Sequence, residues 1–227
     1  MRSFPVTNIS LRITAVMLAA MTLAAQQAPQ EKEGQLQFPP AQPIPARAAP
    51  TDYTGRAAVG KFTIAAEFTG HSVPTSQGPL TSEDYLAVEV AVFGPADAKL
   101  KLSPEDFSLR INGAKKPISI THVEMLYKSL KDPEYIVPDV GEKKSKSGMS
   151  TGGEKGQDSA PPSPPPIPFE VKRNIAQRAQ KAALIEGERP LPVAGVLFFQ
   201  SGKQTKSIKS VELVYEGPAG KARIALQ

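Results

Sequence analysis

Short stretches in which apolar residues recur at every second position constrain the fold of this chain more than any other feature. Such alternation is typical of strands with one buried face. It occurs in two segments of the first half, residues 61–68 and 85–93. In the second segment the aliphatic residues share one face, and Glu89 marks the opposite face as the one nearer to water. The pattern therefore predicts half-buried antiparallel strands.

Residues 99–111 repeat this alternation on both sides of a turn. Ser103 is followed by one proline and two acids, which is the pattern of a capped helical turn. The Asn-Gly pair at 112–113 predicts a hairpin, with residues 117–123 as the returning strand. Residues 124–137 fit a short helix over the sheet as well as they fit another strand.

Residues 169–187 are predicted to form the one helix of the fold. Pro168 precedes this segment, Gly187 closes it, and apolar residues recur along one arc of the helix surface. Arg178 lies in the middle of that arc. We therefore expect a helix that lies across the sheets, with a basic amphipathic helix on a membrane surface as the alternative.

Proline is concentrated in two segments of a chain that has 23 prolines in 227 residues. Residues 26–58 are also rich in glutamine, and residues 138–168 are rich in glycine and lysine. Such compositions bury too little apolar surface to offset the entropy of an ordered chain. We predict a disordered tether over 26–58 and a disordered insertion over 138–168, which ends in a polyproline II spacer.

The first 25 residues have the pattern of a secretory signal peptide. Arg2 and Arg12 supply a basic start. The apolar run 13–25 that follows is too short to span a bilayer core of about 30 Å as a helix. Small side chains at its end place cleavage near Ala24 or Ala25. A membrane anchor and a buried core helix are the alternatives.

Export follows from this assignment. We expect the mature chain to be periplasmic or secreted, with no transmembrane span after cleavage. Cleavage removes two arginines and no acid from a chain of net charge +5, so the mature chain is only mildly basic. Because nucleic-acid binding usually needs a concentrated basic face, we expect no nucleic-acid partner.

The strand-rich segments 59–137 and 190–227 are predicted to form a single domain. A separate three-stranded piece at the end of the chain would have too small a core to be stable alone. The entropic cost of closing the insertion between the two segments grows only with the logarithm of its length. Several short alternating strands without a βαβ rhythm are typical of an antiparallel β-sandwich, here of seven or eight strands.

Four of the predicted strands and turns share a further pattern. They read YLAVEVAV at 85–92, LSPEDFSL at 102–109, LPVAGVLFF at 191–199 and LVYEG at 213–217. In this order they resemble the immunoglobulin-like domain of unknown function that occurs on many exported bacterial proteins. The resemblance implies an immunoglobulin-like sandwich that acts as a binding or scaffold module. The chain differs from that family in its long insertion and in lacking the lipoprotein cysteine that often anchors such domains.

Side chains suited to catalysis or metal binding are sparse in the sequence. The chain has no cysteine and two histidines, His71 and His122, without the spacing of a zinc site. The acid pairs at 83–84 and 105–106 are adjacent in sequence, so their side chains point apart. Neither a nucleophile elbow nor a phosphate-binding glycine loop is present. We therefore expect no catalytic residue, no metal and no cofactor, and a metal-dependent enzyme is a third hypothesis.

Two functions follow from the sequence. The first is an exported, non-enzymatic binding or scaffold module of the bacterial cell envelope, whose partner is another envelope or secreted protein. The second uses Lys203, Lys206 and Lys209, which lie in a loop without acids, together with the basic insertion. These groups would contact an anionic envelope polymer or lipid headgroups, more weakly as the salt concentration rises. A solvated turn is the ordinary alternative for the three lysines.

Overall fold

The computed structural model describes residues 38–136, 166–201 and 207–227. The predicted signal peptide, the start of the predicted tether and nearly all of the predicted insertion lie outside these residues. Lys203 and Lys206 also lie outside them.

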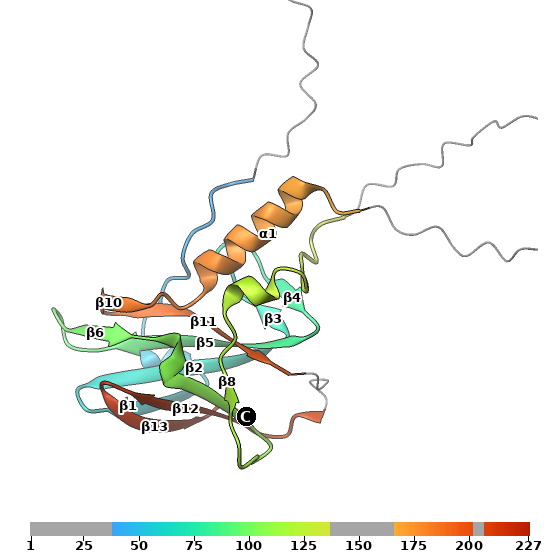
Figure 1. The fold of residues 1–227 in the computed structure, drawn as a ribbon. Helices are drawn as coiled ribbons and strands as arrows, with labels where there is room; N and C mark the ends of the chain where they lie inside the picture. Colours follow the sequence, from blue (N-terminus) through green and yellow to red (C-terminus); the bar gives the residue numbers. More distant parts are fainter. Residues whose placement is uncertain (1–37, 137–165, 202–206) are drawn as a thin grey trace, which may run out of the picture. The chain divides into compact units, whose positions relative to one another are not determined.

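Two four-stranded antiparallel sheets form the main part of the fold (Figure 1). The first sheet has the order β1-β2-β5-β11, with β1 at Gly55–Val59, β2 at Phe62–Gly70, β5 at Tyr85–Phe93 and β11 at Val193–Gln200. The second sheet has the order β13-β12-β7-β8, with β13 at Gly220–Ala225, β12 at Val211–Gly217, β7 at Phe107–Ile111 and β8 at Ile118–Ser119.

Two smaller antiparallel sheets, one α-helix and three short 3-10 turns complete the described fold. Strand β10 (Gly187–Pro190) pairs with β6 (Lys99–Leu102). Strand β4 (Leu80–Ser82) lies between β3 (Ser72–Val73) and β9 (Leu130–Lys131). Helix α1 spans Phe169–Ala182, and the 3-10 turns η1, η2 and η3 span Pro50–Asp52, Pro104–Asp106 and Val123–Leu126.

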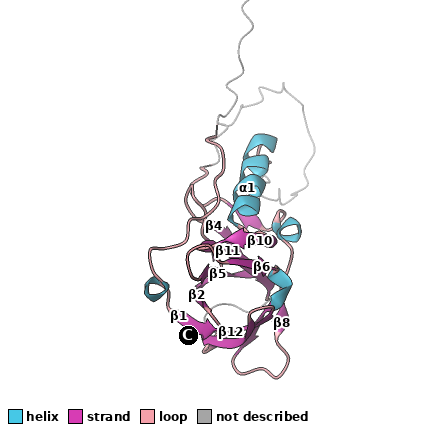
Figure 2. Cartoon of the chain, turned by 90° about the vertical axis from the view of Figure 1, so that its left-hand side faces the viewer, coloured by secondary structure: helices cyan, strands magenta, loops and turns pink. Residues whose placement is uncertain are grey.

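The main hydrophobic core lies between the two large sheets, which Figure 2 shows as facing layers. Alternate residues of β5 point into this core, and they are completely buried: Leu86, Val88, Val90 and Val92. From the second sheet, Leu109, Leu213 and Ile224 reach the same core. The described chain is therefore mainly β, with antiparallel sheets and one α-helix, as the alternation predicts.

The turn and the hairpin predicted from 103–113 are both present. The Ser103 side chain accepts a hydrogen bond from the Glu105 backbone N–H, and Pro104 occupies the first position of η2. Asn112 and Gly113 both have positive φ angles, of 52° and 66°, and lie in the turn that joins the paired strands β7 and β8. Local sequence determines both features.

The prediction of seven or eight strands concerns the sandwich, whose two large sheets hold four strands each, and further strands lie outside these sheets. The described residues contain strands β1 to β13. Several of the additional strands have only two or three residues, too few for an alternating pattern to be recognised. The described part of the segment 124–137 contains both of the predicted alternatives. The helical turn η3 extends into it as far as Leu126, and the short strand β9 follows at Leu130–Lys131.

The prediction that Glu89 marks a wetter face of β5 is wrong. Glu89 is only 5 % exposed, and Ala87 and Ala91 on the same face are fully buried. Helix α1 packs over part of this face, where Ala87 and Phe198 share a second apolar cluster with the helix (Figures 1 and 2). An alternating strand does not reveal whether a segment distant in sequence will cover its polar side.

The ordered fold begins earlier than the predicted tether allows. Strand β1 starts within the predicted tether, and Tyr53 is only 3 % exposed. Arg47 holds this segment on the first sheet, because it forms ion pairs with Glu67 and with Glu89, the latter at 2.8 Å. Its guanidinium also lies 4.5 Å from the ring centroid of Tyr53. Glu67 and Glu89 are cross-strand neighbours on β2 and β5, so this anchor depends on strand pairing rather than on local composition.

Helix α1 begins at Phe169, as predicted, but it ends at Ala182 rather than at Gly187. Beyond it the chain becomes extended, and the Leu184 N–H donates a hydrogen bond to the Val196 carbonyl of β11 at 3.0 Å. Gly187 then begins β10. Pairing with strands β11 and β6 overrides the helical pattern of these residues.

Candidate functional site

Two separate segments cover the outer edge of β11. The Leu184 N–H donates to the Val196 carbonyl at 3.0 Å, and the Thr121 N–H donates to the Phe198 carbonyl at 2.7 Å. The first segment follows helix α1, and the second leads from β8 into η3. The edge strand therefore changes its neighbour between Val196 and Phe198, and both neighbours are held in place by backbone hydrogen bonds.

A cavity of about 340 Å³ opens where these two segments meet β11. Val196, Leu197 and Phe198 of β11 contribute to its base and are each at most 2 % exposed. Its accessible apolar lining comes from side chains that are partly or fully exposed: Ile120, Val123, Ala183 and Ile185. Leu184 and Ile185 form one wall, while Ile120 and Val123 contribute to the opposite segment. A cavity of this size lies at the lower end of the range of small-molecule binding sites.

The rim of the cavity is polar and acidic. It carries four exposed side chains, which are His122, Glu124, Gln180 and Glu186. Among the described residues that line the cavity, none is a lysine or an arginine. Glu124 comes from the segment on one side of the cavity and Glu186 from the segment on the other, so each side of the rim carries a carboxylate.

Asp106 lies in η2, whose first residue Pro104 also lines the cavity. Burial raises the pKa of the Asp106 carboxyl, and repulsion from Glu105 and Glu186 raises it further. A hydrogen bond from the Ser103 backbone and the charge of Lys101 oppose this rise. Within the described part of the chain, the buried Oδ2 atom of Asp106 has no hydrogen-bond partner. The Asp106 carboxyl itself does not line the cavity.

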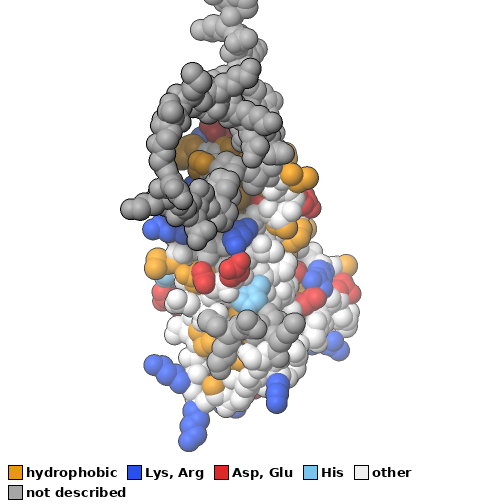
Figure 3. Space-filling view, turned by 90° about the vertical axis from the view of Figure 1, so that its right-hand side faces the viewer, with side chains coloured by type: hydrophobic (Ala, Val, Ile, Leu, Met, Phe, Trp, Pro, Cys, Tyr) orange, Lys and Arg blue, Asp and Glu red, His pale blue; other side chains and the backbone are white. Residues whose placement is uncertain are grey.

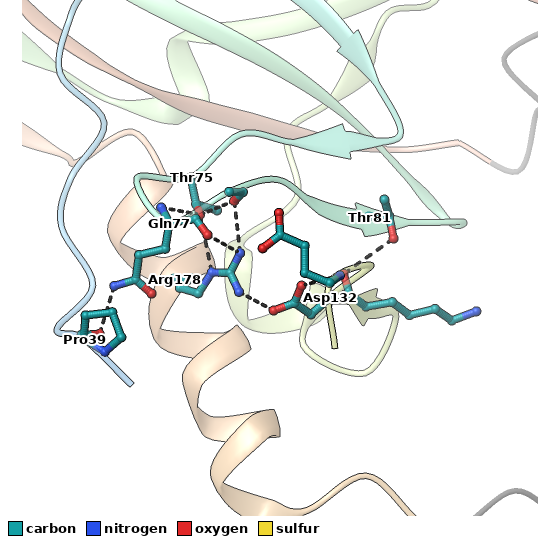
Figure 4. A network of polar contacts seen from close by, with 9 residues as sticks. Pro39, Thr75, Gln77, Thr81, Asp132 and Arg178 are labelled. Atoms are coloured by element: carbon teal, nitrogen blue, oxygen red, sulfur yellow. Dashed lines mark hydrogen bonds and ion pairs between the residues drawn. The ribbon is translucent and has the colours of Figure 1, made fainter. Parts of the chain in front are cut away.

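Arg178 joins helix α1 to the β3–β4 loop and to Asp132, which follows β9 (Figure 4). Its side chain is nearly inaccessible, forms an ion pair with Asp132, and donates from Nη2 to the carbonyls of Gln77 at 3.1 Å and Gly78 at 3.0 Å. The Nε atom lies 3.4 Å from Oγ1 of Thr75. A charged residue in the middle of the apolar arc is thus explained by its ion pair and hydrogen bonds.

The apolar arc of α1 is also buried, because its residues pack on β11 and on the segment around η3. These residues are Val171, Ile175, Ala179 and Ala182. The helix therefore lies across the first sheet, as predicted, and its apolar side is not available to a membrane surface.

The structure separates the two histidines from each other. His122 lies at the cavity rim, whereas the Nδ1 atom of His71 lies 3.0 Å from the Tyr85 carbonyl on β5. Glu83 pairs with Lys131 at 2.6 Å. Within the ranges that the structure describes, no group of three or more His, Cys, Asp or Glu side chains could hold a metal ion.

Of the three candidate lysines, only Lys209 belongs to the described residues, and it is exposed. Its backbone N–H donates to Oδ1 of Asn112 at 2.7 Å, so its segment lies against the β7–β8 loop, which carries the exposed residues Lys115 and Lys116. Figure 3 shows Lys and Arg side chains at the lower end of one face, the end where the β7–β8 loop lies in Figure 1.

Sequence reasoning did not identify the cavity. Its lining comes from Pro104 and from three stretches of the chain that only the tertiary fold brings together, around residues 120–124, 180–186 and 196–198. The rim acids lie in no recognisable motif. The helical pattern of residues 183–186 was misleading, because these residues are extended in the structure and line the cavity.

Comparisons with protein-family models, with curated proteins and with solved structures found no match to this chain. In the part of the chain that the structure describes, no helix is both long and apolar enough to cross a membrane. Fold and site together define a mainly β protein, built from antiparallel sheets, with a preformed surface cavity at the edge of one sheet.

Proposed function

We propose that this chain is an exported, non-enzymatic, immunoglobulin-like binding or scaffold module of the bacterial cell envelope. It engages another envelope or secreted protein through the cavity at the edge of β11. The observation that carries this proposal is a surface cavity in which accessible apolar side chains are bordered by an exposed polar rim. This combination is the usual anatomy of a pocket that receives an anchoring side chain of a partner protein.

Two further observations support the immunoglobulin-like assignment. The stretches 85–92 and 191–199, which resemble that family, are paired antiparallel strands of the first sheet. The stretch 213–217 lies on β12, which pairs with β7 in the second sheet, and the stretch 102–109 leads into β7. The resembling stretches therefore occupy adjacent strands in both layers of the core.

Cross-linking capture from an envelope extract tests the proposed function. The chain without residues 1–25 is used as bait, with washes at low and at high salt. We expect one stoichiometric protein partner that survives high salt, because the contact is centred on apolar groups. Ile185→Asp, which places a charge in the cavity wall, should abolish this capture.

Phe169→Asp is the matched control, because Phe169 is an exposed apolar residue at the other end of the α1 region and does not line the cavity. This variant should capture the partner as well as the wild-type chain does. A specific hydrolase activity that is lost on one point substitution would contradict a non-enzymatic role. Equal capture by Ile185→Asp would remove the cavity from the proposal.

Export is tested by expression of the full chain in a bacterium, followed by fractionation and sequencing of its amino terminus. We expect a periplasmic or secreted product that begins near residue 25 or 26. An uncleaved product in the cytoplasm would contradict the proposed address.

A second candidate function is the binding of an anionic envelope polymer. It is favoured by the hydrogen bond from the Lys209 backbone to Asn112, because this contact joins the predicted basic loop to the lysines of the β7–β8 loop. Replacement of Lys203, Lys206 and Lys209 by Gln should lower the salt concentration at which the chain elutes from a heparin column. Replacement of the exposed Lys61, Lys99 and Lys172 by Gln removes the same charge elsewhere and should lower it less.

A further inference from the structure

We infer that the β11-edge cavity recognises an extended segment of the partner in which one apolar side chain is flanked, two residues away on each side, by lysine or arginine. This inference rests on the proposed function and specifies the chemistry of its partner.

The apolar lining selects an apolar side chain. The apolar surface that a ligand can reach comes from Ile120 and Val123 on one side and from Ala183 and Ile185 on the other. Beneath it, Val196 and Phe198 of β11 are already almost inaccessible. A charged group at this depth would lose its hydration without gaining a partner, which is strongly unfavourable. A branched aliphatic side chain instead removes apolar surface from water on both partners.

The rim selects positive charge on the residues beside that anchor. Glu124 and Glu186 stand on different walls, and no lysine or arginine is found among the lining residues that the structure describes. Lysine and arginine can lay their methylene stems on an apolar surface while their charged ends stay in water beside an acid.

An extended chain matches this arrangement. Residues two apart in a strand point to the same side and are separated by about 6.7 Å. With the central side chain in the cavity, the side chains two residues away face the rim on either side. The cavity is bounded by two segments that are already fixed to β11 by hydrogen bonds, so the site is formed before the partner binds.

The test is a titration of the ¹³C-labelled chain, followed by methyl NMR, with four blocked pentapeptides. The first is Lys-Thr-Leu-Thr-Lys. The others replace both lysines with Glu, the central Leu with Ala, or both. We expect the first peptide to bind with a Kd in the millimolar range or tighter and to shift the methyl signals of Ala183, Ile185 and Val196. The change of flanks to Glu, and the change of centre to Ala, should each weaken binding about tenfold.

Variants of the rim test whether its acidic side chains contribute to binding of the lysine-flanked peptide. The double variant Glu124→Gln/Glu186→Gln should weaken binding of the first peptide about fivefold, and the difference should shrink as salt is raised. The double variant Glu170→Gln/Glu188→Gln removes the same charge from exposed positions that do not line the cavity, and it should bind as the wild type does. All four substituted residues are exposed, and an unchanged midpoint of thermal unfolding will show that the variants fold.

Equal binding of the Lys-flanked and Glu-flanked peptides would overturn the inference, as would an equal loss in both double variants. Failure of every peptide to shift the cavity methyl signals would also overturn it. If the peptides fail while capture of the protein partner still depends on Ile185, the sequence assigned to the partner is wrong and the proposed function stands. If capture fails as well, both are contradicted.

Discussion

The first sheet is covered in two contrasting ways, on its outer face by helix α1 and along its β11 edge by two short segments. The helix is fixed by a buried apolar stripe and by the inaccessible ion pair between Arg178 and Asp132. The edge segments are fixed by backbone hydrogen bonds, and they leave a cavity with an exposed rim between them. The contrast separates surface that the fold uses for its own stability from surface that remains for a ligand.

This contrast predicts that substitutions under the helix lower stability, whereas substitutions at the rim change binding alone. Four predictions test it, in order of decreasing effect.

The largest effect is expected from Arg178→Met. Because this change leaves the Asp132 carboxylate, which is only 11 % exposed, without its partner, we expect the free energy of unfolding to fall by about 3 kcal/mol. Urea denaturation measures it. Arg178→Met combined with Asp132→Leu removes both charges and should recover much of the loss. A loss below about 1 kcal/mol in the single variant would contradict a structural role for this pair.

Ile175→Ala should have the next largest effect. Ile175 lies on the apolar stripe of α1 and is 4 % exposed, so the change leaves a void between the helix and the sheet. We expect a loss of about 2–4 kcal/mol in unfolding free energy, also measured by urea denaturation. Gln180→Ala, on the exposed side of the same helix, is the control and should stay within about 0.5 kcal/mol of the wild type.

Asp106→Asn should raise stability slightly at neutral pH. The pKa of this carboxyl is raised in the folded state by burial, so the unfolded state binds fewer protons and is favoured as pH rises through the interval between the two pKa values. The variant lacks this term. Its advantage over the wild type, at most about 1 kcal/mol, should be present at pH 7 and disappear below about pH 4, near the ordinary pKa of aspartate.

Thermal unfolding of both chains from pH 3 to pH 7 measures this difference. A variant that is less stable than the wild type at pH 7 would show that the charged form of Asp106 stabilises the fold, contrary to the raised pKa.

The double variant Glu124→Gln/Glu186→Gln should have the smallest effect on stability. Both side chains are exposed at the cavity rim, so we expect the unfolding free energy to remain within about 0.5 kcal/mol of the wild-type value. Thermal denaturation at pH 7 provides the measurement. A large loss of unfolding free energy would show that the rim acids stabilise the fold as Arg178 does, contrary to the expected difference between the two regions.

Much of the fold follows from local pattern. The alternation in 85–93 identifies the core-facing side chains of β5 correctly, from Leu86 to Val92, because a half-buried strand repeats every two residues. The capping of η2 by Ser103 and the Asn-Gly turn depend on neighbouring residues only, and both were predictable. The mainly β class with one helix follows from the same signals.

The remaining features depend on residues far apart in sequence. Glu89 is buried because Arg47 reaches it from the segment before β1. Leu184 leaves the helical conformation because Val196 of β11 offers it a hydrogen bond. The cavity could not be predicted for the same reason, since its rim acids Glu124 and Glu186 come from two segments that are neighbours only in the folded chain. Periodicity along one segment carries no information on such pairings.

Hydrogen–deuterium exchange on the cross-linked complex with the captured envelope partner tests the central claim most directly. The claim is that the partner occupies the cavity at the edge of β11. We expect added protection of backbone amides in residues 120–124 and 183–186, with exchange in residues 112–116 and 207–210 unchanged. Protection confined to the latter two segments would contradict this account and would favour binding through the lysines near Asn112.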